Sequence, residues 1–274
     1  MKFDSKSQFF SCYVIHYTPL VERRQFLEKA LSEIEVNWVT EKNVSVENYP
    51  WRNTNYVFGV SKRLIAADLG INARSLSRTR RRARFESYLY RYASLLGSNF
   101  EETTYGSLPR YKRLPQRILE LNSMHLNALM LFLQENHEWA LLLEDDAVFS
   151  QDGISQVQMI SQEKRKGAVW INLNDGAGLK RTASEKRINK NGLFRVTPPT
   201  TRCASAYMFN RKYAKNMNDL IEVHGLPDWL PIDVIFQVAN RKIKAESYWS
   251  EPAKFVQGSE SGFYKSNFKS LRES

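Results

Sequence analysis

A short apolar run that ends in three acids limits what this chain can fold into. Residues 140–143, Ala-Leu-Leu-Leu, lead directly into Glu144, Asp145 and Asp146. The run has the length and composition of a buried strand, and three adjacent carboxylates repel one another and resist removal from water. A fold that puts them at the end of a core strand therefore needs a cation or strong hydrogen-bond donors beside them. The alternative is an acidic turn after an ordinary strand.

Hard metal ions suit such a group of acids. Mg²⁺ and Mn²⁺ take carboxylate oxygens as ligands and often share them with the phosphates of a substrate. The sequence contains none of the common catalytic or cofactor-binding motifs that would compete with this interpretation. It has no Gly-x-x-x-x-Gly-Lys phosphate loop, no Gly-x-Gly-x-x-Gly, no Cys-x-x-Cys and no His-Glu-x-x-His. The three acids are therefore the main candidate for a site of chemistry.

The first half of the chain alternates between strand and helix patterns. Residues 9–17 predict a strand, residues 20–34 an amphipathic helix and residues 36–39 a second strand. The strongest helical pattern covers residues 114–136 and leads directly into the acidic strand. This alternation favours an α/β fold. We expect a single Rossmann-type domain over residues 1–274, with a mixed central sheet flanked by helices.

The second half continues the alternation. Residues 154–163 and 211–221 have helical patterns, and residues 168–173 and 193–196 have strand patterns. Small residues are frequent over residues 203–209, where they let the backbone approach a ligand or a neighbouring helix closely.

Several polar residues stand at positions where a site is expected. In open α/β sheets ligands bind beyond the carboxyl ends of strands, so His16 and Tyr17 lie where a nucleotide would contact the protein. His16 can equally be a structural residue with satisfied hydrogen bonds. Glu120 and His125 interrupt an apolar helical pattern, and each either faces the cleft or caps a buried backbone group. Asp233 lies between apolar residues, which indicates a helix N-cap, a carboxylate with a raised pKa suited to a general base, or both.

Composition predicts a globular protein without a membrane span. Of the 274 residues 42% are hydrophobic and 25% charged, and no apolar stretch is long enough to cross a bilayer. The first residues lack the apolar core of a secretory signal, so we expect a cytoplasmic protein. Cys12 and Cys203 are expected to be buried free thiols rather than a disulfide.

The charge is strongly positive. Forty Lys and Arg against 29 Asp and Glu give a net charge of +11, which favours anionic partners. Nine of these cations and only two acids fall between Lys62 and Arg91, with Arg80, Arg81 and Arg82 in the middle. The block is open to three interpretations: a helix-turn-helix over residues 61–92, an inserted helical pair that docks on a phosphorylated acceptor or anionic lipids, or a solvated surface.

Four short stretches carry a family resemblance through their shared order. The first is Tyr13-Val-Ile-His-Tyr17 with Glu22-Arg-Arg24, and the second is Glu120-Leu-Asn-Ser-Met-His125 followed by Leu143-Glu-Asp-Asp-Ala147. The third is Trp170-Ile-Asn-Leu173 with Ala206-Tyr207 and Ala214, and the fourth is Pro231-Ile-Asp233 with Glu251-Pro-Ala-Lys-Phe-Val-Gln257 and Ser259. In this order they resemble glycosyltransferase family 25, the sugar transferases of lipopolysaccharide and collagen. Residues 41–113 lie outside the resemblance, and a mainly helical basic insertion is expected over about 52–113.

The resemblance implies a GT-A type fold, a nucleotide-sugar donor and inversion at the anomeric carbon. It implies that Mn²⁺ or Mg²⁺ is held by Asp146 together with Glu144 or Asp145, and that Asp233 is the catalytic base. Residues expected to contact the donor or support its site are His16, Tyr17, Arg24, Glu120, His125, Glu144 and Asp145. The family often has Asn at the position of His16, which changes the expected nucleotide contacts.

The resulting hypothesis is a hexosyltransferase of bacterial surface glycans. It moves a hexose such as galactose from a UDP-sugar to an acceptor such as lipooligosaccharide. Arg80, Arg81 and Arg82 would draw it to an anionic acceptor or to the inner face of the inner membrane as a peripheral protein. The alternatives are a nucleic-acid-binding regulator that uses residues 61–92 and an inactive family member that only binds carbohydrate.

Overall fold

The computed structural model describes residues 9–52, 56–58, 60–61, 113–175, 192–197 and 199–264. The basic block of residues 62–91, with Arg80, Arg81 and Arg82, lies outside the described residues. The three interpretations of that block therefore stay predictions.

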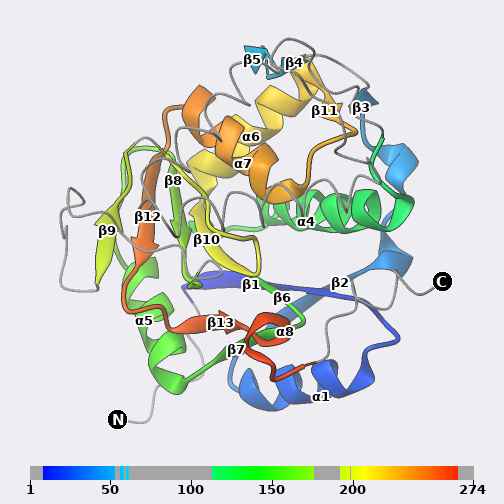
Figure 1. The fold of residues 1–274 in the computed structure, drawn as a ribbon. Coiled ribbons are helices and arrows are strands. Elements are labelled where there is room, and N and C mark those ends of the chain that lie inside the picture. The colour runs from blue at the N-terminus through cyan, green and yellow to red at the C-terminus, as the bar shows by residue number, and fades with distance from the viewer. Residues whose placement is uncertain are drawn as a thin grey trace, which may run out of the picture.

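A seven-stranded mixed sheet forms the centre of the fold and confirms the α/β class (Figure 1). Its strand order is β2-β1-β6-β10-β8-β12-β9. β1 runs parallel to β2 and β6, β10 is antiparallel to β6 and β8, β12 is parallel to β8, and β9 is antiparallel to β12. The strands are β1 Phe10–His16, β2 Val36–Thr40, β6 Trp139–Glu144, β8 Val169–Asn172, β9 Leu193–Arg195, β10 Ala206–Asn210 and β12 Glu246–Ser250.

Helices cover both faces of the sheet. In Figure 1, α4, α6 and α7 lie above the sheet and α1 and α5 lie below it. Alternate side chains of a strand point to opposite faces of the sheet. Both faces of the central strands are apolar because helices cover each of them. In β6, Leu141 and Leu143 pack with α1 and α5, whereas Ala140 and Leu142 pack with the other three helices. The helices are α1 Val21–Ala30, α4 Gln116–Gln134, α5 Gln151–Ser161, α6 Arg211–His224 and α7 Ile232–Lys242.

Short elements complete the described chain. A two-stranded sheet of β7 and β13, followed by α8, brings residues near the end of the chain beside the turn that follows β6 (Figure 1). β3 pairs with β11, and β4 pairs with β5. These elements are β3 Trp51–Arg52, β4 Tyr56–Val57, β5 Val60–Ser61, β7 Ala147–Phe149, β11 Leu226–Pro227, β13 Phe255–Gln257, α8 Gly258–Ser261 and the 3₁₀ turns η1 Glu41–Asn43 and η2 Val46–Asn48.

The elements expected from the sequence outside the basic insertion are present, with shifted ends and two corrections. The helix expected over residues 20–34 ends at Ala30, four residues early. Pro231 is the N-cap of α7 and Asp233 lies in the first turn, so the N-cap interpretation of Asp233 is wrong. Cys12 and Cys203 are free thiols, as expected, but only Cys12 is buried, and Cys203 lies among polar side chains. None of the helices in the described ranges is long and apolar enough to cross a membrane.

The order of the strands creates a switch point between β1 and β6. From β1 the chain passes through α1 to β2 on one side, and it later returns through α4 to β6 on the other side. Connections that diverge in this way leave a crevice at the carboxyl ends of the two strands, where ligands bind in open α/β sheets. Ile15 and Glu144 are paired at those ends, so the acids lie at this switch point.

Candidate active site

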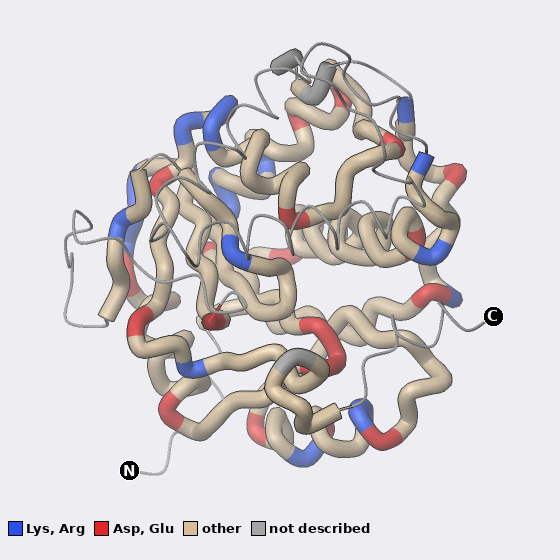
Figure 2. The backbone as a smooth tube through the Cα atoms, in the orientation of Figure 1, with Lys and Arg blue, Asp and Glu red and all other residues tan. Residues whose placement is uncertain are grey.

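The three acids leave β6 in different directions. Glu144 is the last residue of β6, and Asp145 and Asp146 form the turn before β7. Because side chains alternate along a strand, Glu144 continues on the α4 side and Asp145 faces the α1 side. The acids form a continuous red stretch of the backbone tube, whereas Lys and Arg are spread over several elements (Figure 2).

Asp145 is held by three donors. Its Oδ1 accepts a hydrogen bond from Arg23 Nη1 at 2.8 Å, and its Oδ2 accepts the backbone N–H of Tyr17 at 3.0 Å. His16 Nδ1 lies 3.1 Å from the same Oδ2. Asp145 and His16 are both buried. The charge of Asp145 is therefore balanced by the protein itself, and the contacts tie the end of β1 and the first turn of α1 to the acidic turn.

Asp146 is buried, and only one of its two carboxylate oxygens has a hydrogen-bond partner among the described residues. Ser259 Oγ donates to its Oδ2, and the N–H of Gly258 donates to its backbone carbonyl at 2.7 Å. Its Oδ1 has no hydrogen-bond partner within the described part of the chain. Burial, followed by the nearby charge of Glu144, raises the pKa of Asp146 to about 6. A buried carboxylate oxygen without a donor is costly, which makes it a candidate ligand for a cation.

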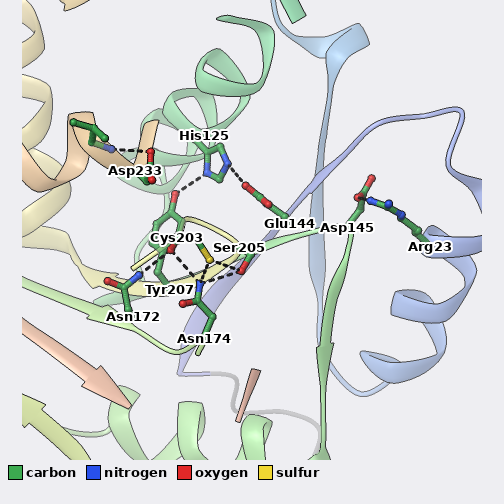
Figure 3. A network of polar contacts seen from close by, with 11 residues as sticks. Arg23, His125, Glu144, Asp145, Asn172, Asn174, Cys203, Ser205, Tyr207 and Asp233 are labelled. Atoms are coloured by element: carbon green, nitrogen blue, oxygen red, sulfur yellow. Dashed lines mark hydrogen bonds and ion pairs between the residues drawn. The ribbon is translucent and has the colours of Figure 1, made fainter. Parts of the chain in front are cut away.

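Glu144 is the most accessible of the three acids. Its side chain is 19% exposed, and its Oε1 lies 3.2 Å from Nε2 of His125 on α4. On the other side of the imidazole ring, Nδ1 lies 2.9 Å from the hydroxyl of Tyr207 on β10. Figure 3 shows His125 between these two partners. His125 therefore contacts one of the three acids, and its expected role in supporting a donor site stays a prediction.

Asp233 reaches this region from α7. Its Oδ1 accepts the N–H of Val234 at 2.9 Å, and its carbonyl accepts the hydroxyl of Thr201 at 2.8 Å. One turn further on α7, the ring of Phe236 lies edge-on to His125 with centroids 6.5 Å apart. In the view of Figure 3, Asp233 and Glu144 lie on opposite sides of His125.

Arg24 and Glu120, two other residues expected at the site, have surroundings other than the three acids. Arg24 donates to Glu28 one turn further along α1, at 2.8 Å, and its guanidinium covers the ring of Trp38 at 4.5 Å. Glu120 is partly buried on α4, and its side chain makes no hydrogen bond or ion pair with the residues that the structure describes. Neither contacts the three acids, so their expected role in donor binding stays a prediction.

Four residues of the site were given no role there from the sequence. Arg23, Tyr207 and Ser259 occur only as members of the stretches that carry the family resemblance, and Arg117, whose guanidinium lies 4.6 Å from the centroid of the Tyr17 ring, was not named. Helical spacing contains a signal for one of them, because Arg23 lies four residues before the buried Leu27 and shares its inward face. For Tyr207 and Ser259 the only signal is their place in the stretches that carry the resemblance, and no local pattern points to Arg117.

Two carboxylates at the site remain open to a cation. Within the described ranges no group of three His, Cys, Asp or Glu residues is arranged to hold a metal ion by itself. The charge of Glu144 helps to raise the pKa of Asp146, whereas Asp145 is neutralised by Arg23, so Glu144 and Asp146 are the two acids left for a cation. A comparison with protein-family models finds no match to this chain, and a comparison with curated proteins finds none either.

Proposed function

We propose that this chain is an inverting, metal-dependent glycosyltransferase. It moves a hexose such as galactose from a nucleotide sugar, such as a UDP-sugar, to a bacterial surface glycan such as lipooligosaccharide. The observation that carries the proposal is the buried Oδ1 of Asp146, which has no hydrogen-bond partner in the described residues and lies at the switch point of the sheet. The ordered resemblance of four sequence stretches to glycosyltransferase family 25 supports the choice of reaction.

The acids fit a divalent ion that is shared with a substrate. Glu144 and Asp146 would hold Mn²⁺ or Mg²⁺, since Mg²⁺ is commonly bound through one or two carboxylates together with substrate phosphates. Asp145 is unsuited to the ion because three donors already occupy its oxygens. When bound, the ion would neutralise charge on the departing nucleotide diphosphate.

The end of β1 would hold the nucleotide. Tyr17 and Arg117 offer an aromatic ring and a guanidinium stacked on each other beside the acids. Such a pair can contact a flat base or a diphosphate. His16 is buried and bound to Asp145, so it would shape the nucleotide site from behind rather than touch the base.

Asp233 is the proposed base. In an inverting transfer the acceptor oxygen attacks the anomeric carbon on the face opposite the diphosphate, and the bond from that carbon to the diphosphate oxygen breaks. The acceptor hydroxyl loses its proton to a carboxylate as the new bond forms. Asp233 approaches from α7, whereas the proposed metal ligands lie at the end of β6, so donor and acceptor would be activated from different elements.

Thermal unfolding with a panel of nucleotide sugars, with and without Mn²⁺, tests the proposal. A true donor should raise the unfolding midpoint only when Mn²⁺ is present, because Glu144 and Asp146 would hold the ion that neutralises the diphosphate. Asp146→Asn should abolish this shift, whereas Asp152→Asn, at a side chain 78% exposed, should preserve it. If no nucleotide sugar shifts the midpoint and none is hydrolysed with Mn²⁺, the chain is not a glycosyltransferase.

A further inference from the structure

A hydrogen-bonded chain runs from the core of the protein to the proposed site. It begins at the hydroxyl of Tyr207, passes through the two ring nitrogens of His125 and ends at Oε1 of Glu144 (Figure 3). The two contacts are 2.9 Å and 3.2 Å long. Tyr207 and His125 are completely buried, and Glu144 is the member of this hydrogen-bonded series that is exposed to solvent.

The contacts decide which nitrogen of His125 carries the proton. The only acceptor for the Tyr207 hydroxyl hydrogen in the described part of the chain is His125 Nδ1. A buried hydroxyl hydrogen without an acceptor costs about 1–3 kcal/mol, so Tyr207 donates to Nδ1. The proton of the ring then belongs to Nε2, which donates it to the carboxylate of Glu144.

The other protonation states leave a buried group unsatisfied. With the proton on Nδ1 alone, the lone pair of Nε2 would face the oxygen of Glu144, and two acceptors would repel each other. With both nitrogens protonated, the hydrogen of the Tyr207 hydroxyl would face the N–H of His125 or point into the core without an acceptor. Only the neutral Nε2–H tautomer satisfies Tyr207, His125 and Glu144 together.

Packing holds the hydrogen-bonded side chains of Tyr207, His125 and Glu144 in place. Trp170 stacks on the Tyr207 ring at 4.3 Å between centroids, and the His125 ring stacks on the Tyr207 ring at 5.9 Å between centroids. Tyr207 pairs across the sheet with Leu142, two residues before Glu144 on the same face of β6. The hydroxyl, the imidazole and the carboxylate are therefore fixed by adjacent strands and by α4.

We propose that Tyr207 is a positioning residue of the site. It fixes the Nε2–H tautomer of His125, and through His125 it holds the carboxylate of Glu144 in the orientation that meets a divalent ion. The role of Glu144 as an ion ligand rests on the proposed function, whereas the tautomer of His125 does not. Removing a hydrogen-bond partner behind a metal ligand usually weakens metal binding by about 10- to 100-fold.

Nitrogen-15 NMR of the imidazole rings tests the tautomer directly at mildly alkaline pH. The chain has four His residues, so each can be assigned from a substitution. His125 should carry its proton on Nε2 and His16 on Nδ1, the nitrogen that faces Asp145, which makes His16 an internal reference. A proton on Nδ1 of His125 in the unsubstituted protein would overturn the proposal, whether Nε2 is protonated or not.

Tyr207→Phe and Tyr213→Phe form a matched pair of variants. Both tyrosines are completely buried in one aromatic cluster, but the hydroxyl of Tyr213 has no hydrogen-bond partner among the described residues. Mn²⁺ binding, followed by electron paramagnetic resonance, should weaken about tenfold in Tyr207→Phe and stay unchanged in Tyr213→Phe. Only Tyr207→Phe should lose the fixed Nε2–H tautomer.

The positioning role of Tyr207 and the metal-dependent function can fail separately. Equal Mn²⁺ affinity in both variants would overturn the positioning role of Tyr207. If the unsubstituted protein binds no Mn²⁺ while His125 has the Nε2–H tautomer, the hydrogen-bonded chain stands and the proposed metal-dependent function fails. If nucleotide-sugar transfer is found and Tyr207→Phe changes neither the tautomer nor Mn²⁺ binding, the function stands and the positioning role fails.

Discussion

Arg23 donates a hydrogen bond to Asp145 across 2.8 Å and so joins the first turn of α1 to the turn after β6. About a tenth of each side chain is exposed. The ring of Tyr264, near the end of the described chain, lies 5.0 Å from the same guanidinium. Through these two contacts Arg23 connects three distant parts of the sequence. Its bond to Asp145 also removes that acid from those available to a ligand.

Loss of Arg23 should destabilise the protein far more than loss of its neighbour Arg24. Arg23→Ala leaves Asp145 buried without its strongest partner, which costs about 3–5 kcal/mol of unfolding free energy. Arg24→Ala removes an exposed pair with Glu28, worth at most about 0.5 kcal/mol, and a guanidinium contact with the Trp38 ring, worth about 0.5–1 kcal/mol. Urea unfolding of both variants measures the difference. Equal losses would show that the Arg23–Asp145 pair contributes no more than a surface ion pair.

Asp146 should make the metal-free protein less stable as the pH rises. Its pKa is raised from 3.8 to about 6, so the folded protein holds a proton in this interval that the unfolded chain has released. Stability therefore falls as pH rises through that interval, by at most about 3 kcal/mol. Asp146→Asn removes the dependence and should be more stable than the unsubstituted protein at neutral pH, in the absence of divalent ions.

Urea unfolding between pH 4 and pH 7 checks this dependence over roughly the interval in which the two states differ in bound protons. The exposed variant Asp152→Asn is the control and should follow the unsubstituted protein. Parallel stability curves for Asp146→Asn and the unsubstituted protein would contradict a raised pKa at Asp146.

The segment that holds Asp146 should not tolerate a side chain at Gly258. A Cβ there would lie 2.6 Å from the ring of Tyr264 and 2.8 Å from the carbonyl oxygen of Asp146. Gly258→Ala should cost about 1–3 kcal/mol of stability. Because it displaces the segment that places Ser259 on Asp146, it should also weaken Mn²⁺ binding.

Gly262→Ala is the matched control for that substitution. Gly262 has a φ of +83°, and apart from its chain neighbours no atom of the described residues lies within 4 Å of a Cβ built there. Its substitution should cost about 1–2 kcal/mol through backbone strain alone and leave Mn²⁺ affinity unchanged. Similar Mn²⁺ affinities in the two variants would mean that the Gly258 contact does not position Asp146.

Asp233→Asn should separate catalysis from folding. If Asp233 is the base, turnover should fall about 10²- to 10⁴-fold while the Mn²⁺-dependent binding of the donor is preserved. The substitution should cost no more than about 1 kcal/mol of stability, the usual value of an acid in the first turn of a helix. Steady-state kinetics and urea unfolding give the two quantities. Near-normal turnover with that small loss of stability would restrict Asp233 to a structural role in α7.

Much of the fold follows from local patterns in the sequence. Short apolar runs and helical spacing predict β1, α1, β2, α4 and β6 within a few residues, because both signals depend on neighbours along the chain. The short pairs β7–β13 and β3–β11 were not predicted. Two- and three-residue strands contain too few side chains to show a period, and their partners lie far away in sequence.

The sequence by itself determined that three acids follow a core strand, and it indicated that they need neutralising partners. Only the tertiary structure decided which partner each acid receives. Asp145 is 122 residues from Arg23, and Asp146 is 113 residues from Ser259. The choice depends on the placement of β6 beside β1, which exposes one face of β6 to α4 and the other to α1. Strand order is set by packing of the whole core, and no local spacing encodes it.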